Sequence, residues 1–329
     1  MTANQQTIPI FFTFNRYYVL AACVAFHSLL ETASPLYRYH LYVVHTGLTP
    51  HQQQRLQKVV GKFPHAELSF IPAPKYDTGW SGLQNKSHFS KEIFYKMTAA
   101  SIFPQYDRIL FSDVDVIFTD DISPSYFLFP DEKFYFAGTR PIMENKNLPS
   151  YKPDFSEDEI KLINQYEISA GYMLINLKEI RQDGIEQRLV DYFQKNVYRL
   201  RLPEQDCIAL CCQPHLLFMD YKYVVCNYLY DLNPESITYN VNNPQLSSQS
   251  QAAEIYRKML KEVVQLHFVG SEKPWNNRHA PKFQEWMAVC RQAGLYRQYL
   301  LEQPLFFCQR LKRYSLKRFL KKLKNRILK

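Results

Sequence analysis

Apolar and polar positions follow two different periods along the first half of the chain. Short runs of apolar, β-branched and aromatic residues predict strands at 8–14, 39–45, 67–71 and 108–112. Between these runs, apolar residues recur at helical spacing and predict helices at 18–30, 50–63 and 91–103. Strands that alternate with helices form βαβ units, so the pattern predicts an α/β fold with a mostly parallel, Rossmann-like central sheet flanked by helices.

The second half continues the pattern with longer interruptions. We expect strands at 134–138 and 172–177 and a helix over 178–195. A surface loop at 145–161 leads into a helix at Ser156, whose spacing to Glu159 is that of a capping box. The segment 233–253 turns to Asn, Gln and Ser and is expected to be poorly structured.

Charge is concentrated at one end of the chain. The net charge is +9, but 310–329 holds ten of the 40 Lys and Arg residues and no acid, which leaves 30 basic against 31 acidic residues in 1–309. Apolar residues in the tail recur at helical spacing among the lysines, so 306–329 is predicted to be a basic amphipathic helix that lies on an anionic membrane surface. Nucleic acid is a second partner for such a charge run, but the interleaved Phe and Leu favour lipid, and no nucleic-acid partner is expected.

The sequence predicts neither a membrane-spanning helix nor a signal peptide. Its longest apolar run, 17–26, is far shorter than a bilayer span, and the first residues lack the pattern of a signal peptide. The seven cysteines include no C-x-x-C pair, which suits a reducing compartment. Cys207, Cys211, Cys212 and His215 have a spacing that fits a helix with small apolar residues better than a zinc site. We therefore expect a cytoplasmic protein, peripheral on the inner face of the cell membrane.

Two carboxylates follow the apolar run that ends near residue 112. The segment DRILFSDVDVIF places Asp113 and Asp115 two positions apart, so on a strand they would share one face and converge on a cation. The flanking residues are apolar on both faces, which is typical of a central parallel strand whose carboxyl end binds ligands. Taken alone, the triplet also fits a solvated turn.

A second candidate segment lies late in the chain. In QLHFVGSEKPWN an apolar run carries His267, Gly270 opens a turn, and Lys273 follows. His267 is an imidazole that could complete a metal site with the two aspartates, and Lys273 is a cation placed to meet phosphate oxygens. There is no G-x-G-x-x-G and no Walker loop among the nine glycines, so the usual glycine-rich cradles would not hold a phosphate here.

Together these segments resemble glycosyltransferase family 8, the retaining nucleotide-sugar transferases of the GT-A fold, and among them the bacterial lipopolysaccharide glucosyl- and galactosyltransferases. The resemblance runs from about residue 8 to residue 275. Its motifs are IFFTFNRYYVLAACVAFHSLL, HFSKEIFYKM, FSDVDVIF, ISAGYMLINL, LPEQD and HFVGSEKPW. It implies a GT-A domain over 1–280 and a helical C-terminal extension over 281–329.

The resemblance also implies roles for individual residues. Asp113, Asp115 and His267 would ligate Mn²⁺, with Mg²⁺ possible, on the donor diphosphate. The donor would also be contacted by Lys273, Gly270, Tyr18, Asn15, Lys96 and Ser169. Glu204, Gln205 and Asp206 of LPEQD would be the catalytic residues, with Gln205 beside the anomeric carbon.

Four of these positions depart from the pattern of the family. Lys96 stands for the usual arginine, which keeps the charge but loses the bidentate fork. Glu204 stands for the first aspartate of Asp-Gln-Asp and Asn15 for an aspartate near the base, where an amide oxygen can still accept the uracil imide hydrogen. Ser169 stands for an asparagine at the sugar site and leaves a shorter polar group there.

The predicted function is therefore a metal-dependent retaining transfer of glucose or galactose from a UDP-sugar to a lipid-linked glycan, such as the lipopolysaccharide core. No carboxylate stands out as a nucleophile, so we expect attack from the same face as departure. Two alternatives remain open at this point: a metal-dependent nucleotidyl- or phosphotransferase, and a sugar-nucleotide-binding protein without activity.

Overall fold

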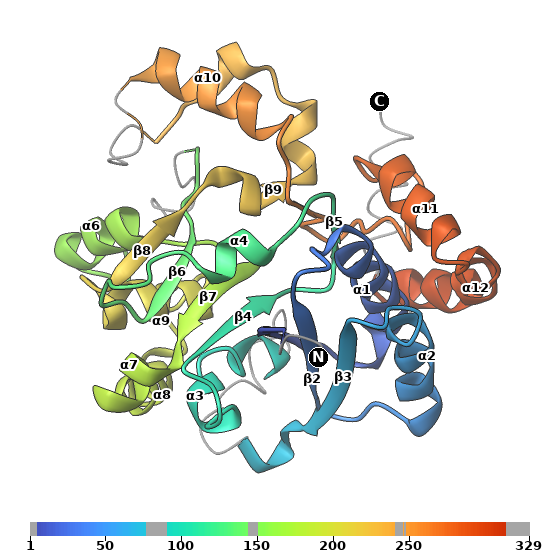
Figure 1. The fold of residues 1–329 in the computed structure, drawn as a ribbon. Coiled ribbons are helices and arrows are strands. Elements are labelled where there is room, and N and C mark those ends of the chain that lie inside the picture. The colour runs from blue at the N-terminus through green and yellow to red at the C-terminus, as the bar shows by residue number, and fades with distance from the viewer. Residues whose placement is uncertain (1–4, 77–90, 144–150, 241–245, 247, 314–329) are drawn as a thin grey trace.

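The computed structural model describes residues 5–76, 91–143, 151–240, 246 and 248–313 (Figure 1). Its largest element is a seven-stranded sheet with the order β3-β2-β1-β4-β7-β6-β8. The strands are β1 (Thr7–Thr13), β2 (Arg38–His45), β3 (Ala66–Pro72), β4 (Arg108–Ser112), β6 (Phe136–Thr139), β7 (Tyr172–Asn176) and β8 (Leu216–Met219). Only β7 runs antiparallel to its neighbours in this sheet, so the predicted mostly parallel sheet is confirmed.

Both faces of the sheet are covered, because side chains on both faces of its central strands are apolar. In β1, Phe11 packs in one core cluster, whereas Ile10 and Phe12 pack in another. The first cluster also holds side chains of α3 (Ala99–Ile102), α6 (Glu157–Tyr166), α7 (Leu177–Gln182), α8 (Ile185–Asn196) and α9 (Pro203–Cys212). The second holds side chains of α1 (Val19–Thr32) and α2 (Pro50–Val60), with Tyr126 of α4 (Ser123–Tyr126) packed against it. The outcome is a layered α/β domain (Figure 1).

A smaller sheet continues from the large one. It has the order β5-β10-β9, with strands β5 (Val116–Phe118), β10 (Gln265–His267) and β9 (Val225–Cys226). Ile117 and Leu266 of this sheet share a third core cluster with α1, α11 (Phe283–Gln292) and α12 (Tyr296–Arg313). A fourth cluster surrounds α10 (Gln249–Met259). The small sheet therefore holds residues from the middle and the end of the chain side by side.

Three predicted elements were wrong in their extent. The predicted helix over 91–103 is a 3₁₀ turn, Lys91–Phe94, followed by the short α3. The predicted helix over 178–195 is divided into α7 and α8, because Gly184 between them adopts φ +64°, a conformation that glycine tolerates. The segment 233–253 contains the start of α10, which Ser248 caps by accepting a hydrogen bond from the backbone N–H of Gln251. Residues 241–245 and 247 lie outside the described residues.

Other expectations are met or stay open. The capping box of Ser156 and Glu159 is present, and the three cysteines at 207, 211 and 212 are buried on α9. Most of the predicted tail, 314–329, lies outside the described residues, and the division at residue 280 stays a prediction. In the part of the chain that the structure describes, no helix has the length and apolarity that a bilayer span requires.

Candidate functional site

Asp113 and Asp115 lie where the chain passes from the large sheet to the small one. They occupy a bend between β4 and β5, not one continuous strand as predicted. The backbone N–H of Asp113 donates to the carbonyl of Gly171 in 2.9 Å, and the carbonyl of Asp115 accepts from the N–H of Phe268 in 2.8 Å. Each aspartate is thus fixed to a different neighbouring segment, and the convergence of the two carboxylates comes from the bend.

His267, at the end of β10, lies between the two carboxylates. Its Nε2 is 3.3 Å from Asp115 Oδ1 and 3.7 Å from Asp113 Oδ2. One ligand atom from each of the three side chains lies within 4.8 Å of the others, which is a spacing that one metal ion can bridge. The structure therefore brings together the three residues that the sequence predicted as metal ligands.

Gly171 closes one side of this group, and the sequence analysis missed it. A Cβ atom built at Gly171 would lie 2.8 Å from both Cε1 and Nδ1 of His267 and 3.3 Å from Asp113 Oδ2. A side chain at this position would therefore displace one of the metal-ligand candidates, so glycine is required by close approach and not by a turn. The only sequence signal was a glycine directly before a buried strand.

Lys273 contacts the second carboxylate. Its Nζ donates to Asp115 Oδ2 in 2.6 Å and also to the carbonyl of Phe268, and the side chain is 10% exposed. Burial alone would raise the pKa of Asp115, but Lys273 and His267 outweigh it and hold that pKa well below its usual range. Asp115 is therefore ionised at any ordinary pH, as a metal ligand must be.

Lys96 lies on the other side of the group and is 1% exposed. Its Nζ donates a hydrogen bond of 3.0 Å to the carbonyl of Ala170. The same Nζ lies 3.9 Å from Asp113 Oδ1 and 3.6 Å from Glu204 Oε1. Burial raises the pKa of Asp113, which Lys96 partly offsets. Lys96 thus links the metal-ligand candidates to the start of α9 from inside the protein, with both carboxylates within 4 Å.

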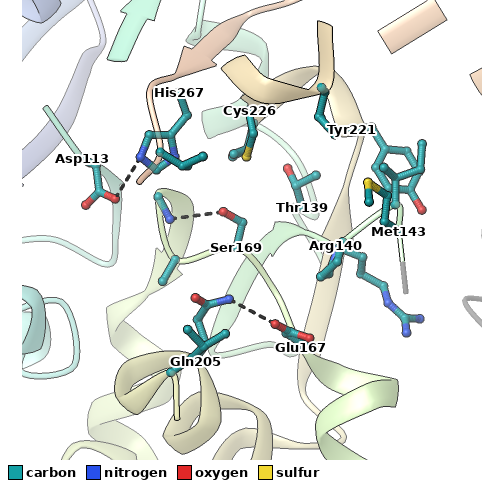
Figure 2. Close-up of a pocket in the computed structure, with 18 of the residues that line it drawn as sticks. Asp113, Thr139, Arg140, Met143, Glu167, Ser169, Gln205, Tyr221, Cys226 and His267 are labelled. Atoms are coloured by element: carbon teal, nitrogen blue, oxygen red, sulfur yellow. Dashed lines mark hydrogen bonds and ion pairs between the residues drawn. The ribbon is translucent and has the colours of Figure 1, made fainter. Parts of the chain in front are cut away.

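A pocket of about 520 Å³ opens beside the metal-ligand candidates (Figure 2). Asp113, Gly171 and His267 line one end of it, Ser169 and residues of α9 line its floor, and Tyr228 and Met259 lie among the side chains of the rest. The Oγ of Ser169 accepts a hydrogen bond from the N–H of Gly171 in 3.4 Å. This volume is within the range of small-molecule binding sites.

The three candidates in the first turn of α9 differ in what they face. Glu204 and Gln205 line the pocket, and the buried Glu204 Oε2 has no hydrogen-bond partner among the described residues. Asp206 is 1% exposed and is not among the lining residues. Its Oδ1 accepts from the hydroxyl of Tyr151 in 2.7 Å, and its Oδ2 accepts from the N–H groups of residues 201 and 202. Asp206 therefore holds the start of α9 in place, and the structure does not bring its side chain to the pocket.

The candidates for nucleotide contact lie outside this pocket. Asn15 caps a 3₁₀ turn, Arg16–Tyr18, by accepting from the N–H of Tyr17 in 3.1 Å. The ring of Tyr18 meets that of Trp275 edge to face at 5.6 Å, which places it beside the segment that carries Lys273. Gly270 is exposed and has φ +82°. These residues gather on the Lys273 side of the metal-ligand candidates.

Comparison with known proteins finds relatives that match most of this chain. General stress protein A of Bacillus subtilis (strain 168) is 22% identical over 257 residues, which cover 77% of this chain and 82% of that protein. The bifunctional glycosyltransferase WbbM superimposes with a TM-score of 0.72 at 15% identity over 92% of this chain, which spans about half of WbbM (52%). The galactosyltransferase LgtC, solved with donor and acceptor sugar analogs, superimposes with a TM-score of 0.63 at 18% identity and covers 87% of this chain and 95% of LgtC.

These two structures share the GT-A fold of glycosyltransferases with this chain. The family model described as glycosyl transferase family 8 matches residues 9–279, which is most of the 329 residues. The chain therefore belongs to glycosyl transferase family 8.

Proposed function

We propose that this protein is a metal-dependent, retaining hexosyltransferase that moves glucose or galactose from a UDP-sugar to a lipid-linked glycan, such as the lipopolysaccharide core. Membership of a glycosyltransferase family supports the reaction class. The observation that carries the proposal is the meeting of Asp113, Asp115 and His267 at one end of a sugar-sized pocket.

The residues present fit a divalent metal ion. Two carboxylates and one imidazole form a mixed oxygen and nitrogen donor set, which suits Mn²⁺ or Mg²⁺, with the imidazole favouring Mn²⁺. The missing side chain of Gly171 leaves room for the imidazole beside Asp113. When bound, the ion would stabilise the charge that develops on the departing diphosphate.

On the nucleotide side, the proposed roles are those that the resemblance to the family implies. Lys273 would meet diphosphate oxygens, and Gly270, in an exposed turn with positive φ, would let the backbone approach them. Tyr18 would stack on the uracil ring and Asn15 would accept its imide hydrogen. For Lys96 we revise the expected contact with the donor, because this side chain is buried against Ala170 and between two carboxylates. Lys96 instead holds Asp113 and Glu204 in place.

On the sugar side, Glu204 and Ser169 would bind hydroxyl groups of the donor, with Gln205 beside the anomeric carbon. Asp206 has both oxygens bound by protein donors, which argues against its acting as a nucleophile. The bond from the anomeric carbon to the diphosphate then breaks with its electron pair leaving on the diphosphate. The acceptor hydroxyl attacks the same face, and its proton passes to the departing phosphate oxygen.

The membrane part of the proposal rests on the end of the chain. Leu300, Leu301 and Leu305 of α12 are exposed, directly before the basic tail, and would enlarge an apolar surface for anionic lipid. Phe306, in contrast, is 5% exposed and packs in the core. A truncation that tests membrane binding should therefore start after Arg313. It should release the protein from anionic vesicles without unfolding it, and unchanged partitioning would contradict this part of the proposal.

The central test is a donor screen with Mn²⁺ that scores free UDP from UDP-glucose, UDP-galactose and their N-acetyl forms in the presence of glycolipid acceptors. Asp115→Ala should lower the rate by about two to three decades. The matched control is Asp120→Ala, which removes an exposed carboxylate five positions away and should keep full activity. Release of pyrophosphate would instead support a nucleotidyltransferase, and metal-dependent binding without turnover would support a binding protein.

A further inference from the structure

One carboxylate in the pocket has no role so far. Glu167 follows α6 directly, and its backbone N–H donates to the carbonyl of Ile163 in 2.8 Å. Its side chain lines the pocket and is 6% exposed. Opposite it stands Gln205, in the first turn of α9. The end of α6 thus lies next to the start of α9, and Figure 2 shows Glu167 and Gln205 side by side.

The side-chain amide of Gln205 is oriented by the groups around it. Its Nε2 donates to the carbonyl of Ile168 in 3.0 Å and lies 3.5 Å from Glu167 Oε1. A backbone carbonyl is an acceptor and never a donor, and the same holds for an ionised carboxylate. The NH₂ group of Gln205, and not its oxygen, must therefore face them. Figure 2 shows the nitrogen facing Glu167 and the oxygen turned to the side where Asp113 lies.

The start of α9 is fixed by its neighbours, so the side-chain amide of Gln205 is the group there that can still rotate. Asp206 fixes the backbone before the helix by accepting from the N–H groups of Arg201 and Leu202. Glu204 lies 3.6 Å from the buried Nζ of Lys96. Rotation of the Gln205 amide by half a turn would set its oxygen against two other oxygens, one of them charged. Glu167 makes that flipped state unfavourable more strongly than the neutral carbonyl alone, because a charged acceptor binds N–H more tightly.

We propose that Glu167 is a positioning residue that keeps the oxygen of Gln205 directed at the donor sugar. The inference rests on the proposed function, in which positive charge develops at the anomeric carbon as the diphosphate leaves. An amide oxygen stabilises that charge, whereas a flipped NH₂ group opposes it. Glu167 itself touches no reacting atom and acts through Gln205.

A double-mutant cycle tests this dependence. Glu167→Met removes the acceptor at similar length and should lower kcat about tenfold, with KM for the UDP-sugar changed much less. Glu167→Gln keeps one acceptor oxygen and should recover part of the loss. In a Gln205→Met background, Glu167→Met should lower kcat no further. A tenfold loss in both backgrounds would show that Glu167 acts independently and would overturn the inference. Glu157→Met, at an exposed position of α6, controls for the loss of one charge.

A second measurement is independent of turnover. The side-chain NH₂ signals of Gln205, assigned by their loss in Gln205→Met, should exchange slowly with water in the intact protein and faster in Glu167→Met. Signals that Glu167→Met leaves unchanged would sink the inference even in an active enzyme. If no UDP-sugar is turned over, the proposed function fails, while these signals still decide whether Glu167 orients the amide.

Discussion

Gly171→Ala adds one methyl group where the structure has no room for it. The new Cβ would lie 2.8 Å from two atoms of the His267 ring and 3.3 Å from Asp113 Oδ2, whereas ordinary contacts of a Cβ start at 3.4 Å. One partner must therefore move by about 0.6 Å. The metal-ligand group should be distorted from a position that does not itself bind the ion.

The size of the effect follows from how firmly each partner is held. His267 belongs to β10, which pairs with β5 on one side and β9 on the other, and Gly171 is tied to Asp113 through its carbonyl. Neither His267 nor the backbone at Gly171 can move without straining these contacts. We therefore expect Gly171→Ala to lower the free energy of unfolding by about 1–3 kcal/mol, as in overpacked cores. A displaced ligand should in addition cost about 10–100-fold in metal affinity.

The metal affinity is measured by titrating the protein with Mn²⁺ in the presence of UDP, followed by electron paramagnetic resonance. The lost stability is measured by urea unfolding. Gly47→Ala is the matched control, because a Cβ there meets nothing within 4 Å. It should leave both quantities as in the wild type. If Gly171→Ala also binds Mn²⁺ with wild-type affinity and stability, the close packing of the imidazole against this glycine is refuted.

Two further substitutions probe single charges. Lys273→Met frees Asp115 Oδ2 from its ammonium partner, so calorimetry should show tighter binding of Mn²⁺ alone but weaker binding of UDP; weaker binding of Mn²⁺ alone would contradict this reading. Glu159→Gln keeps the capping box but removes the ion pair with Arg199, whose hydrogen bond is the main cause that lowers the pKa of Glu159. A carboxylate whose pKa is lowered by folding stabilises the fold at pH values above its unfolded pKa of about 4.3. At pH 7, urea unfolding should therefore give the wild type a free energy of unfolding about 1–2 kcal/mol higher than that of the variant. This difference should vanish as the pH falls through the folded pKa of Glu159. A difference that persists in acid would exclude the charge as its source.

Much of the fold was predictable because its strands carry their own signal. The apolar runs that became β1, β2, β3 and β4 are short, bounded and separated by helical patterns, so the parallel sheet followed from them. The division at Gly184 was missed because the helical period continues on both sides of it. The start of α10 was missed because a polar composition hid the buried face of Ala252, Tyr256 and Met259.

The site was predictable in its membership but not in its geometry. Asp113, Asp115 and His267 were proposed as metal ligands from their residue types together with the resemblance to the family, yet the bend between two sheets was not predicted, because the apolar run continues through it without a break. The position of Lys96 depends on three long-range contacts that no local pattern encodes. Glu167 carried no sequence signal, because its proximity to the Gln205 amide arises only from the packing of α6 against α9.

The bend at residues 113–115 contacts segments of the chain that are synthesised much later. Lys273 lies 158 positions after Asp115, and β5 has no partner strand until β10 is made. A nascent chain that ends before His267 can form much of the parallel sheet but leaves the half-buried Asp115 without its imidazole and ammonium neighbours. Asp113, Asp115 and His267 can therefore meet only after residue 267 has been synthesised, so the metal-ligand candidates come together late in the folding of this domain.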